Sequence, residues 1–189
     1  MAADRLKPAS VDINEITVVD FVPLTPENEE DVNTIIRWST RESMVGISLG
    51  SIATHRFAKA AYISDESTGA TRRLVGYGAI THIYSKSVLE VGGLVVAENV
   101  RGSGIASNLV RNTVHDALEA MNPELVLAFS NKRSASLFAK LGGVQIPDAQ
   151  ELPPEVWKVC HTCRFYDDAL AGGDMCCGRV YDITGILEK

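Results

Sequence analysis

The chain has 189 residues, of which 46% are hydrophobic and 22% charged, a composition typical of one globular domain with a sizeable core. Acidic residues outnumber basic ones by 24 to 18, and no dense Lys/Arg stretch is present, which excludes nucleic acid as the expected partner. No apolar run approaches the ~20 residues of a membrane span, and residues 1–14 lack the apolar stretch of a secretory signal. We therefore expect a cytoplasmic domain that does not act on a membrane.

Hydrophobic periodicity and turn residues divide the chain into a leader and one domain. Residues 1–14 show no periodicity and are expected to form a flexible leader, followed by a single domain over 15–189. The patterns predict, in chain order, a strand at 15–22, a helix from Thr25, a short helix within 43–57, and strands at 60–64, 74–84 and 88–97. A long helix follows Arg101 and includes Ile105 to Met121, and after it come a strand at 125–129, a helix at 131–141, and short strands at 144–146 and 179–183.

A glycine loop connects the strand at 88–97 to the long helix. Gly102 and Gly104 lack a Cβ, so the backbone there can approach a pyrophosphate, and the free N–H groups and dipole at the helix start supply the opposite charge. The Gly-Lys-Ser/Thr of a Walker loop is absent, and the dinucleotide-binding pattern would need a glycine where this chain has Ser107. The loop therefore predicts an anion-binding site, with a tight structural turn as the alternative.

Three motifs in order resemble the GCN5-related N-acetyltransferase (GNAT) superfamily. Arg101-x-x-Gly104-x-Ala106 resembles that family's Arg/Gln-x-x-Gly-x-Gly/Ala loop, and Glu90–Val96 is similar to its fourth strand. Leu125–Asn131 is similar to its fifth strand and the Asn after it, and Leu137–Gly142 to its next helix. The resemblance covers roughly residues 15–146 and implies an α/β (α+β) fold, with a mixed, mostly antiparallel central sheet flanked by helices.

The resemblance implies an N-acetyltransferase that moves an acetyl group from acetyl-CoA to a primary amine of a small molecule or protein. The loop amides would hold the coenzyme pyrophosphate, and the adjoining strand would pair with the pantetheine arm and polarise the thioester carbonyl. Asn131 would contact the arm, cap a helix, or do both. The candidate cofactor-binding residues are Leu94, Val95, Val96, Arg101, Gly102, Ser103, Gly104, Ile105, Ala106 and Asn131.

The resemblance also assigns a catalytic position. Glu90 stands where many family members place a carboxylate that acts as a base through water, although an ordinary exposed glutamate is the alternative. Phe138 occupies the position of a tyrosine that protonates the leaving thiolate in many members, and phenylalanine has no proton to donate. A non-catalytic acyl-CoA-binding sensor is therefore an alternative function. His55, His82 and His115 stand alone in the sequence and are expected to be structural or surface imidazoles.

The last part of the chain concentrates its thiols. All four cysteines lie there: Cys160, Cys163, Cys176 and Cys177. Cys-x-x-Cys is half of a common zinc site, so we predict a structural Zn²⁺ in an insertion at 147–178 between the last two strands. The adjacent second pair is an awkward half, with His161 or Asp174 as substitutes, and inert thiols, disulfides or a redox pair remain open. This loop would border the acceptor or, in a third function, bind a protein partner; monomer and homodimer are both compatible with the sequence.

Overall fold

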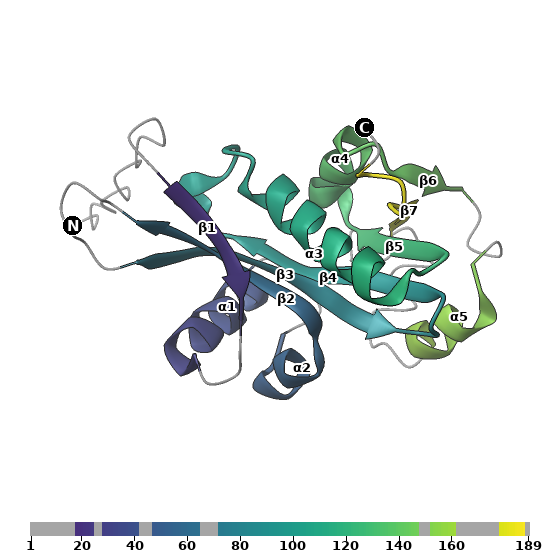
Figure 1. The fold of residues 1–189 in the computed structure, drawn as a ribbon, viewed down its shortest axis with the longest axis horizontal. Helices are drawn as coiled ribbons and strands as arrows, with labels where there is room; N and C mark the ends of the chain where they lie inside the picture. The colour runs from purple at the N-terminus through teal and green to yellow at the C-terminus, as the bar shows by residue number, and fades with distance from the viewer. Residues whose placement is uncertain are drawn as a thin grey trace, which may run out of the picture.

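A computed structural model of the chain describes residues 18–24, 28–41, 47–64, 72–147, 152–161 and 178–187 (Figure 1). Its strands are β1 (Val18–Pro23), β2 (Arg56–Ser64), β3 (Arg73–Ile83), β4 (Val88–Val96), β5 (Leu125–Ser130), β6 (Val144–Ile146) and β7 (Arg179–Asp182). Its helices are α1 (Glu29–Arg41), α2 (Leu49–Thr54), α3 (Ile105–Met121), α4 (Lys132–Lys140) and α5 (Pro154–Cys160), with a short 3-10 helix, η2 (Glu98–Val100), ahead of α3.

The described strands form one seven-stranded sheet in the order β1-β2-β3-β4-β5-β7-β6. Every neighbouring pair is antiparallel except β4 and β5, which run parallel. The parallel pair is connected through α3, as a parallel crossover requires. The mixed, mostly antiparallel sheet flanked by helices that was expected from the sequence is confirmed.

Helices cover both faces of the sheet, as Figure 1 shows. On one face, α3 and α4 pack against the central strands, where Val114 and Phe138 share a buried cluster with Val91. On the other face, Ile35 of α1 and Ile52 of α2 pack on Tyr77, Ala79 and Val95, and Val156 of α5 packs on Val88, Leu127 and Val180. The two halves of the core thus hold β4 and β5 from both sides.

The long helix α3 forms because its apolar residues return to one face. Its buried residues are Ile105, Leu109, Val110, Thr113, Val114 and Ala117. The helix ends at Asn122, which adopts a left-handed conformation with φ of 47° and donates its N–H to the Leu118 carbonyl at 2.9 Å. Gly76 allows close packing, because a Cβ there would lie 2.9 Å from Leu109 Cδ1. The predicted helix is confirmed.

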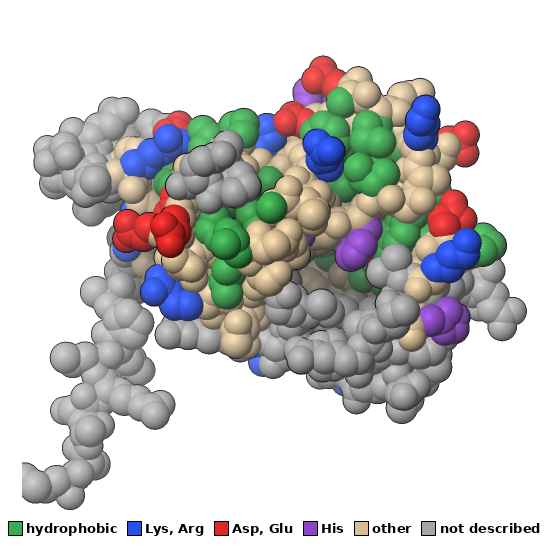
Figure 2. Space-filling view, turned by 90° about the horizontal axis from the view of Figure 1, so that it is seen from below, with side chains coloured by type: hydrophobic (Ala, Val, Ile, Leu, Met, Phe, Trp, Pro, Cys, Tyr) green, Lys and Arg blue, Asp and Glu red, His purple; other side chains and the backbone are tan. Residues whose placement is uncertain are grey.

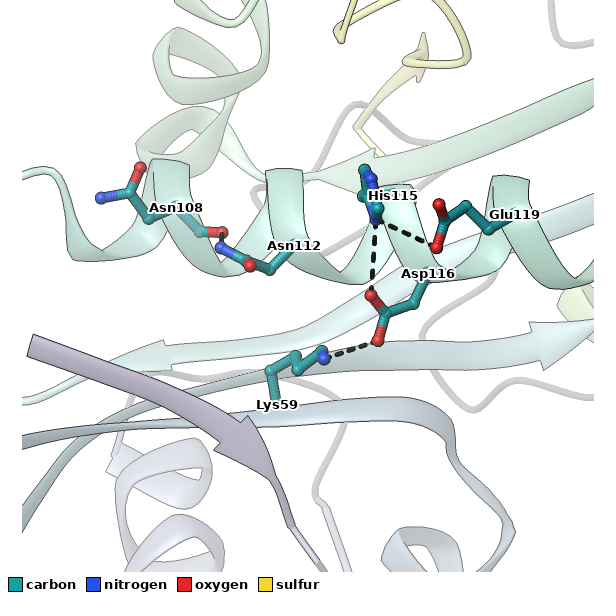
Figure 3. A network of polar contacts seen from close by, with 6 residues as sticks. All are labelled: Lys59, Asn108, Asn112, His115, Asp116 and Glu119. Carbon is teal, nitrogen blue, oxygen red and sulfur yellow. Dashed lines mark hydrogen bonds and ion pairs between the residues drawn. The ribbon is translucent and has the colours of Figure 1, made fainter.

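A network of charges connects α3 to the sheet (Figure 3). Lys59 of β2 lies 2.5 Å from the Asp116 carboxylate of α3, with only 12% of the lysine side chain exposed. His115 Nδ1 lies 3.6 Å from an oxygen of Asp116 and 3.6 Å from an oxygen of Glu119. The pair between Lys59 and Asp116 fixes α3 over β2 at a point far along the helix from the glycine loop.

Three sequence-based predictions differ from the structure or fall outside it. The predicted leader and residues 15–17 and 25–27 lie outside the described residues, and the strand predicted at 60–64 begins earlier, at Arg56. Helix α5 was not predicted from the sequence, because Pro153 and Pro154 are typical of a loop. Pro154 is in fact the first helical residue, a position at which its missing N–H costs nothing.

None of the helices in the described part of the chain combines the length and the apolar character that a membrane crossing needs.

Candidate active site

The sheet opens between β4 and β5. Their pairing extends only over Val88–Val91 of β4 and Leu125–Ala128 of β5, after which the two strands separate. Two residues beyond the last pair, Gly93 has φ of +63° and belongs to a register shift against β3. The opening forms a cavity of about 520 Å³ between the free half of β4, the glycine loop, the end of β5 and α4. Its volume is that of a small-molecule site.

The glycine loop forms one wall of this cavity. Gly102 and Gly104 adopt φ of +87° and +85°, in the left-handed region that favours glycine, and no atom lies within 4 Å of a Cβ built at either position. Gly104 is the N-cap of α3, so the first N–H groups of the helix have no partner inside it. The cavity wall therefore includes the positive end of a helix dipole beside bare backbone.

The cofactor-binding residues predicted from the sequence line the cavity, with the exception of Ser103. The Ser103 hydroxyl donates to the Val100 carbonyl at 2.7 Å, which gives it a role inside the loop. The Arg101 guanidinium donates through Nε to the Val96 carbonyl at 3.2 Å. Arg101 thus links the loop to the free half of β4 and adds positive charge to the cavity wall.

Helix α4 provides the opposite wall. Asn131 Oδ1 accepts from the backbone N–H groups of Arg133 and Ser134, both at 3.0 Å, so the helix-cap interpretation of Asn131 is confirmed. Phe138 is 3% exposed and packs against Tyr181, with ring centroids 6.0 Å apart. Both Asn131 and Phe138 line the cavity, and the wall at Phe138 is apolar.

Other residues of the cavity lining were not predicted from the sequence. They are Val91, Gly92, Gly93, Val100, Ser107, Phe129, Ser134, Ser136, Leu137 and Lys140. A signal for the α4 members was present: Arg133, Ser136, Leu137 and Lys140 follow the i, i+3, i+4, i+7 spacing of one helix face. Because Asn131 caps α4 and was assigned to the site, this face of α4 could also have been expected to line the cavity. Arg133 and Lys140 make this wall basic.

Glu90 lies beside the point where the strands separate, on the face opposite Val91. Only 15% of its side chain is exposed, and its carboxylate is surrounded by polar groups of β3 and the turn that follows. Thr81 donates to Oε1 at 3.4 Å, the Tyr84 hydroxyl donates to Oε2, and His82 Nδ1 lies 3.1 Å from Oε2. The sequence-based candidate is therefore part of a hydrogen-bonded cluster rather than an ordinary exposed glutamate.

A β-bulge in β3 builds this cluster. The register places Ile80 and His82 opposite consecutive residues of β4, so Thr81 is an additional residue on its strand. A bulge interrupts strand alternation, and here Thr81 and His82 both reach Glu90. Thr81 also fills the space over Gly92, where a Cβ would lie 2.6 Å from its Oγ1. Because Gly92 lines the cavity, Thr81 joins the carboxylate cluster to the cavity wall.

Two of the histidines that were expected to be structural or surface imidazoles lie within hydrogen-bond distance of another side chain, His55 of Tyr77 and His82 of Glu90. The hydrogen bond to Glu90 raises the pKa of His82 above 6.5, although 45% of its side chain is exposed. His55, at the end of α2, has its pKa lowered to about 4 by burial and, secondarily, by the positive charge of His82. Two imidazoles with oppositely shifted pKa values thus lie near each other on the sheet face that carries α1 and α2. Figure 2 shows the molecule from below, with histidine side chains among those at its surface.

The predicted zinc site lies largely outside the described residues. Cys163, Cys176 and Cys177 are not described, and for Cys160 only the backbone, at the end of α5, is described. Among the residues that are described, no group of three or more potential metal ligands comes together. The zinc site stays a prediction from the sequence.

Comparison with known proteins places this geometry in a family. The sequence model of the Acetyltransferase (GNAT) family matches residues 25–143, more than half of the chain. The chain therefore belongs to the GNAT family of acetyltransferases, as the resemblance of its motifs indicated. No match to a curated protein sequence was found.

Solved structures share the fold at low sequence identity. Rv2747 from Mycobacterium tuberculosis, in complex with CoA, is 16% identical with a TM-score of 0.63, over 86% of this chain and 96% of that one. N-acetylglutamate synthase from Neisseria gonorrhoeae, in complex with CoA and N-acetyl-glutamate, is 14% identical with a TM-score of 0.64, over 88% of this chain but only 35% of that one. A GNAT-family acetyltransferase from Staphylococcus aureus is 11% identical with a TM-score of 0.59, over 88% and 99%.

Proposed function

We propose that the chain transfers an acetyl group from acetyl-CoA to a primary amine. The observation that carries the proposal is the cavity at the separation of β4 and β5, which has a bare glycine loop and the start of α3 as one wall. Acetyl-CoA supplies a thioester, whose carbonyl carbon an unprotonated amine can attack. The family to which the chain belongs, and relatives solved with CoA, support this assignment.

The cavity suits the parts of coenzyme A in order. The backbone N–H groups between Arg101 and Ala106 match a pyrophosphate, because they combine an absent Cβ with a positive helix end. The segment Leu94–Val96 of β4 has no β5 partner, so the amides of the pantetheine arm could pair with its backbone on that side, and Asn131 stands across the cavity from it. A backbone N–H of this strand segment would stabilise the oxyanion that forms during acyl transfer.

Removal of the amine proton depends on Glu90. The carboxylate lies beside the separation point, on the sheet face away from α3, and it is connected to the cavity through Thr81. An amine approaching from that face would meet the carboxylate cluster, and a cationic amine would be favoured by its negative charge. The acceptor class, small molecule or protein, stays open.

Thermal unfolding with and without excess CoA tests the cofactor assignment. At about 100 times its dissociation constant a ligand adds roughly 2.7 kcal/mol, which for a chain of this size raises the Tm by about 5 to 10 °C. The Arg101→Glu variant reverses a charge on the cavity wall and should lose that shift. Absence of a shift in the wild type would contradict the proposal.

Mass spectrometry of products tests the transfer itself. Acetyl-CoA is incubated with spermine, kanamycin or a lysine-containing peptide, and acetylated amine is measured directly, since thiol reagents would also react with the four cysteines. We expect acetylated product from at least one class of amine. Product formation that Arg101→Glu does not reduce would argue against the cavity as the site.

A second candidate function is a non-catalytic acyl-CoA sensor. Phe138 favours it, since an apolar ring lines the cavity where a tyrosine donates a proton in many family members. A sensor would show the full thermal shift with CoA and no acetylated product from any amine. In the enzyme, the thiolate would take its proton from solvent instead.

The remaining sequence-based predictions extend this proposal. We propose a structural Zn²⁺ held by the four cysteines, in a loop that borders the acceptor or binds a protein partner, and a cytoplasmic location for the protein. Metal analysis of protein purified without chelators tests the first of these. Stoichiometric zinc is expected, and a trace amount would contradict it.

A further inference from the structure

The cluster around Glu90 contains a group that the sequence analysis did not assign to the reaction. His82 and Glu90 are directly opposite each other on β3 and β4, and His82 Nδ1 lies 3.1 Å from the carboxylate. Within the described residues the cluster has three hydrogen bonds to one carboxylate, from Thr81, His82 and Tyr84. A carboxylate that already accepts these bonds is well suited to orient a neighbouring imidazole.

We propose that His82, held in position by Glu90, is the base that removes the proton from the acceptor amine. This inference rests on the proposed function and refines it: Glu90 becomes the positioning residue and His82 the catalytic one. A carboxylate accepts from Nδ1–H, so the neutral ring presents a lone pair on Nε2. No described residue makes a hydrogen bond or ion pair with that second nitrogen.

Exposure and location distinguish the two members of the pair. The His82 side chain is 45% exposed, whereas that of Glu90 is 15% exposed. The imidazole is therefore the member that an acceptor and solvent can reach, on the face that carries α1 and α2. Thr81, between this pair and Gly92 of the cavity wall, connects the imidazole to the end of the cavity nearest the separation of the strands.

The groups that act on the imidazole favour a base that works near neutral pH. Glu90 raises the pKa of His82, and Tyr84 stacks on its ring at 5.6 Å with an interplanar angle of 12°. His55, from the end of α2, has the lowered pKa of about 4, so it is uncharged when His82 titrates. Among the described neighbours, Glu90 therefore provides the charge that stabilises the imidazolium.

The proton and electron pairs balance in this step. The amine nitrogen forms a bond to the thioester carbonyl carbon, and its proton passes to His82 Nε2. The C–S bond then breaks, and its electron pair leaves with the CoA thiolate. The imidazolium returns its proton to solvent and the thiolate takes one from solvent, which gives amide and free CoA.

The first test requires no acceptor. In protein labelled with ¹⁵N in its histidines, the ring nitrogen shifts report the tautomer and the titration of His82. We expect the Nδ1–H tautomer and a midpoint above 6.5 in the wild type, and a lower midpoint in Glu90→Gln. His115→Gln, on α3, is the control and should leave the His82 signals in place. A His82 that titrates identically in the wild type and Glu90→Gln would overturn the inference.

The second test measures rates with acetyl-CoA and the amine of the panel that reacts fastest. His82→Gln should lower kcat/KM by about 100-fold or more and leave the thermal shift with CoA intact. Glu90→Gln should also lower it, by favouring the wrong tautomer, and the double variant should be no slower than His82→Gln alone. Added imidazole should partly restore the activity of His82→Ala. If the role of His82 were purely structural, added imidazole would not restore activity.

The outcomes separate this inference from the proposed function. A chain that binds CoA and acetylates the amine, but whose His82→Gln variant stays within about threefold of the wild type, overturns the inference alone. A wild type with no thermal shift and no product overturns the proposed function. If His82→Gln does not fold, the ring titration in the wild type and Glu90→Gln still decides whether the pair exists.

Discussion

The His55 imidazole and the Tyr77 hydroxyl are joined between the end of α2 and β3, with 2.7 Å between Nδ1 and the phenol oxygen. Tyr77 has no exposed surface, and burial raises the pKa of its hydroxyl. Burial also keeps His55 uncharged, with its pKa lowered to about 4. At neutral pH the two groups therefore form a neutral hydrogen bond on the sheet face that carries α1 and α2.

This pair predicts an acid-sensitive contribution to stability. The folded pKa of His55 lies below its unfolded value of 6.5, so the unfolded chain binds the additional proton first. The stabilisation is present above 6.5 and is lost as the pH falls toward about 4. Urea unfolding of the wild type and of His55→Gln across this range should show a shallower pH slope for the variant. Equal slopes in both proteins would contradict the assignment.

The pKa of His82 is shifted in the opposite direction to that of His55, so the pH dependence of its contribution to stability is also opposite. The pKa of His82 is raised, so its contribution is present below 6.5 and is lost as the pH rises through the folded value. In His82→Gln we expect unfolding free energy to decline less across that upper range. His115→Gln is the matched control, since its imidazole is 55% exposed on α3.

The left-handed glycine at the start of α3 is expected to be required for the loop. Gly104→Ala adds a side chain at φ of +85°, which costs about 1 to 2 kcal/mol and shifts the loop backbone. The thermal shift with CoA should decrease. Gly50→Ala, in α2 with ordinary φ and a nearest atom at 3.9 Å, should leave that shift unchanged. Equal behaviour of the two variants would remove the argument from the loop geometry.

A buried hydroxyl on α3 predicts a stabilising substitution. Thr113 is fully buried, and its Oγ1 has no hydrogen-bond partner among the described residues. Thr113→Val replaces this hydroxyl with a methyl group of similar size and should add about 1 kcal/mol, or about 2 to 4 °C in Tm. Thr113→Ser keeps the hydroxyl, removes the methyl group and should destabilise the protein. A lower Tm for Thr113→Val would show that the hydroxyl is satisfied.

The ion pair between β2 and α3 predicts unequal effects of removing one partner or both. Asp116→Asn leaves the Lys59 ammonium, only 12% exposed, without its carboxylate and should cost about 1 to 3 kcal/mol. Replacing both partners, as in Lys59→Met with Asp116→Leu, should cost less than Asp116→Asn alone. Glu119→Gln, with 71% of the Glu119 side chain exposed, is the control and should change the free energy of unfolding little.

Local sequence patterns were sufficient to predict the loop and its surroundings. The glycines 102 and 104, the amphipathic helix that follows and the cap at Asn131 each depend on chemistry within a few residues, and the structure has them where they were expected. The family motifs then gave the strands on either side. Each of these features is determined by residues close to one another in the chain, so a single sequence is enough to predict it.

The partners of Glu90 could not be predicted in the same way. They depend on a register shift at Thr81. Regular strand alternation would place the His82 side chain on the sheet face opposite Glu90, and the bulge turns it to the same face as Glu90. A bulge has no strong sequence signature, since Thr81 and His82 are ordinary strand residues. In the sequence His82 therefore stands alone, and only the fold shows that Glu90 is its partner.

The early end of the pairing between β4 and β5 also affects the risk that the protein aggregates through its sheet. A strand with a partner on one side only presents a row of free N–H and C=O groups, and at the border of a sheet such a row invites a second chain to add a strand. Here the free half of β4 lies inside the sheet, with the glycine loop and α4 on either side of it. A neighbouring protein's strand, flanked by its own sheet, is too bulky to enter. A narrow, extended molecule can pair with this backbone, whereas a second protein strand cannot. The same enclosure that lowers the risk of aggregation therefore selects ligands by their shape.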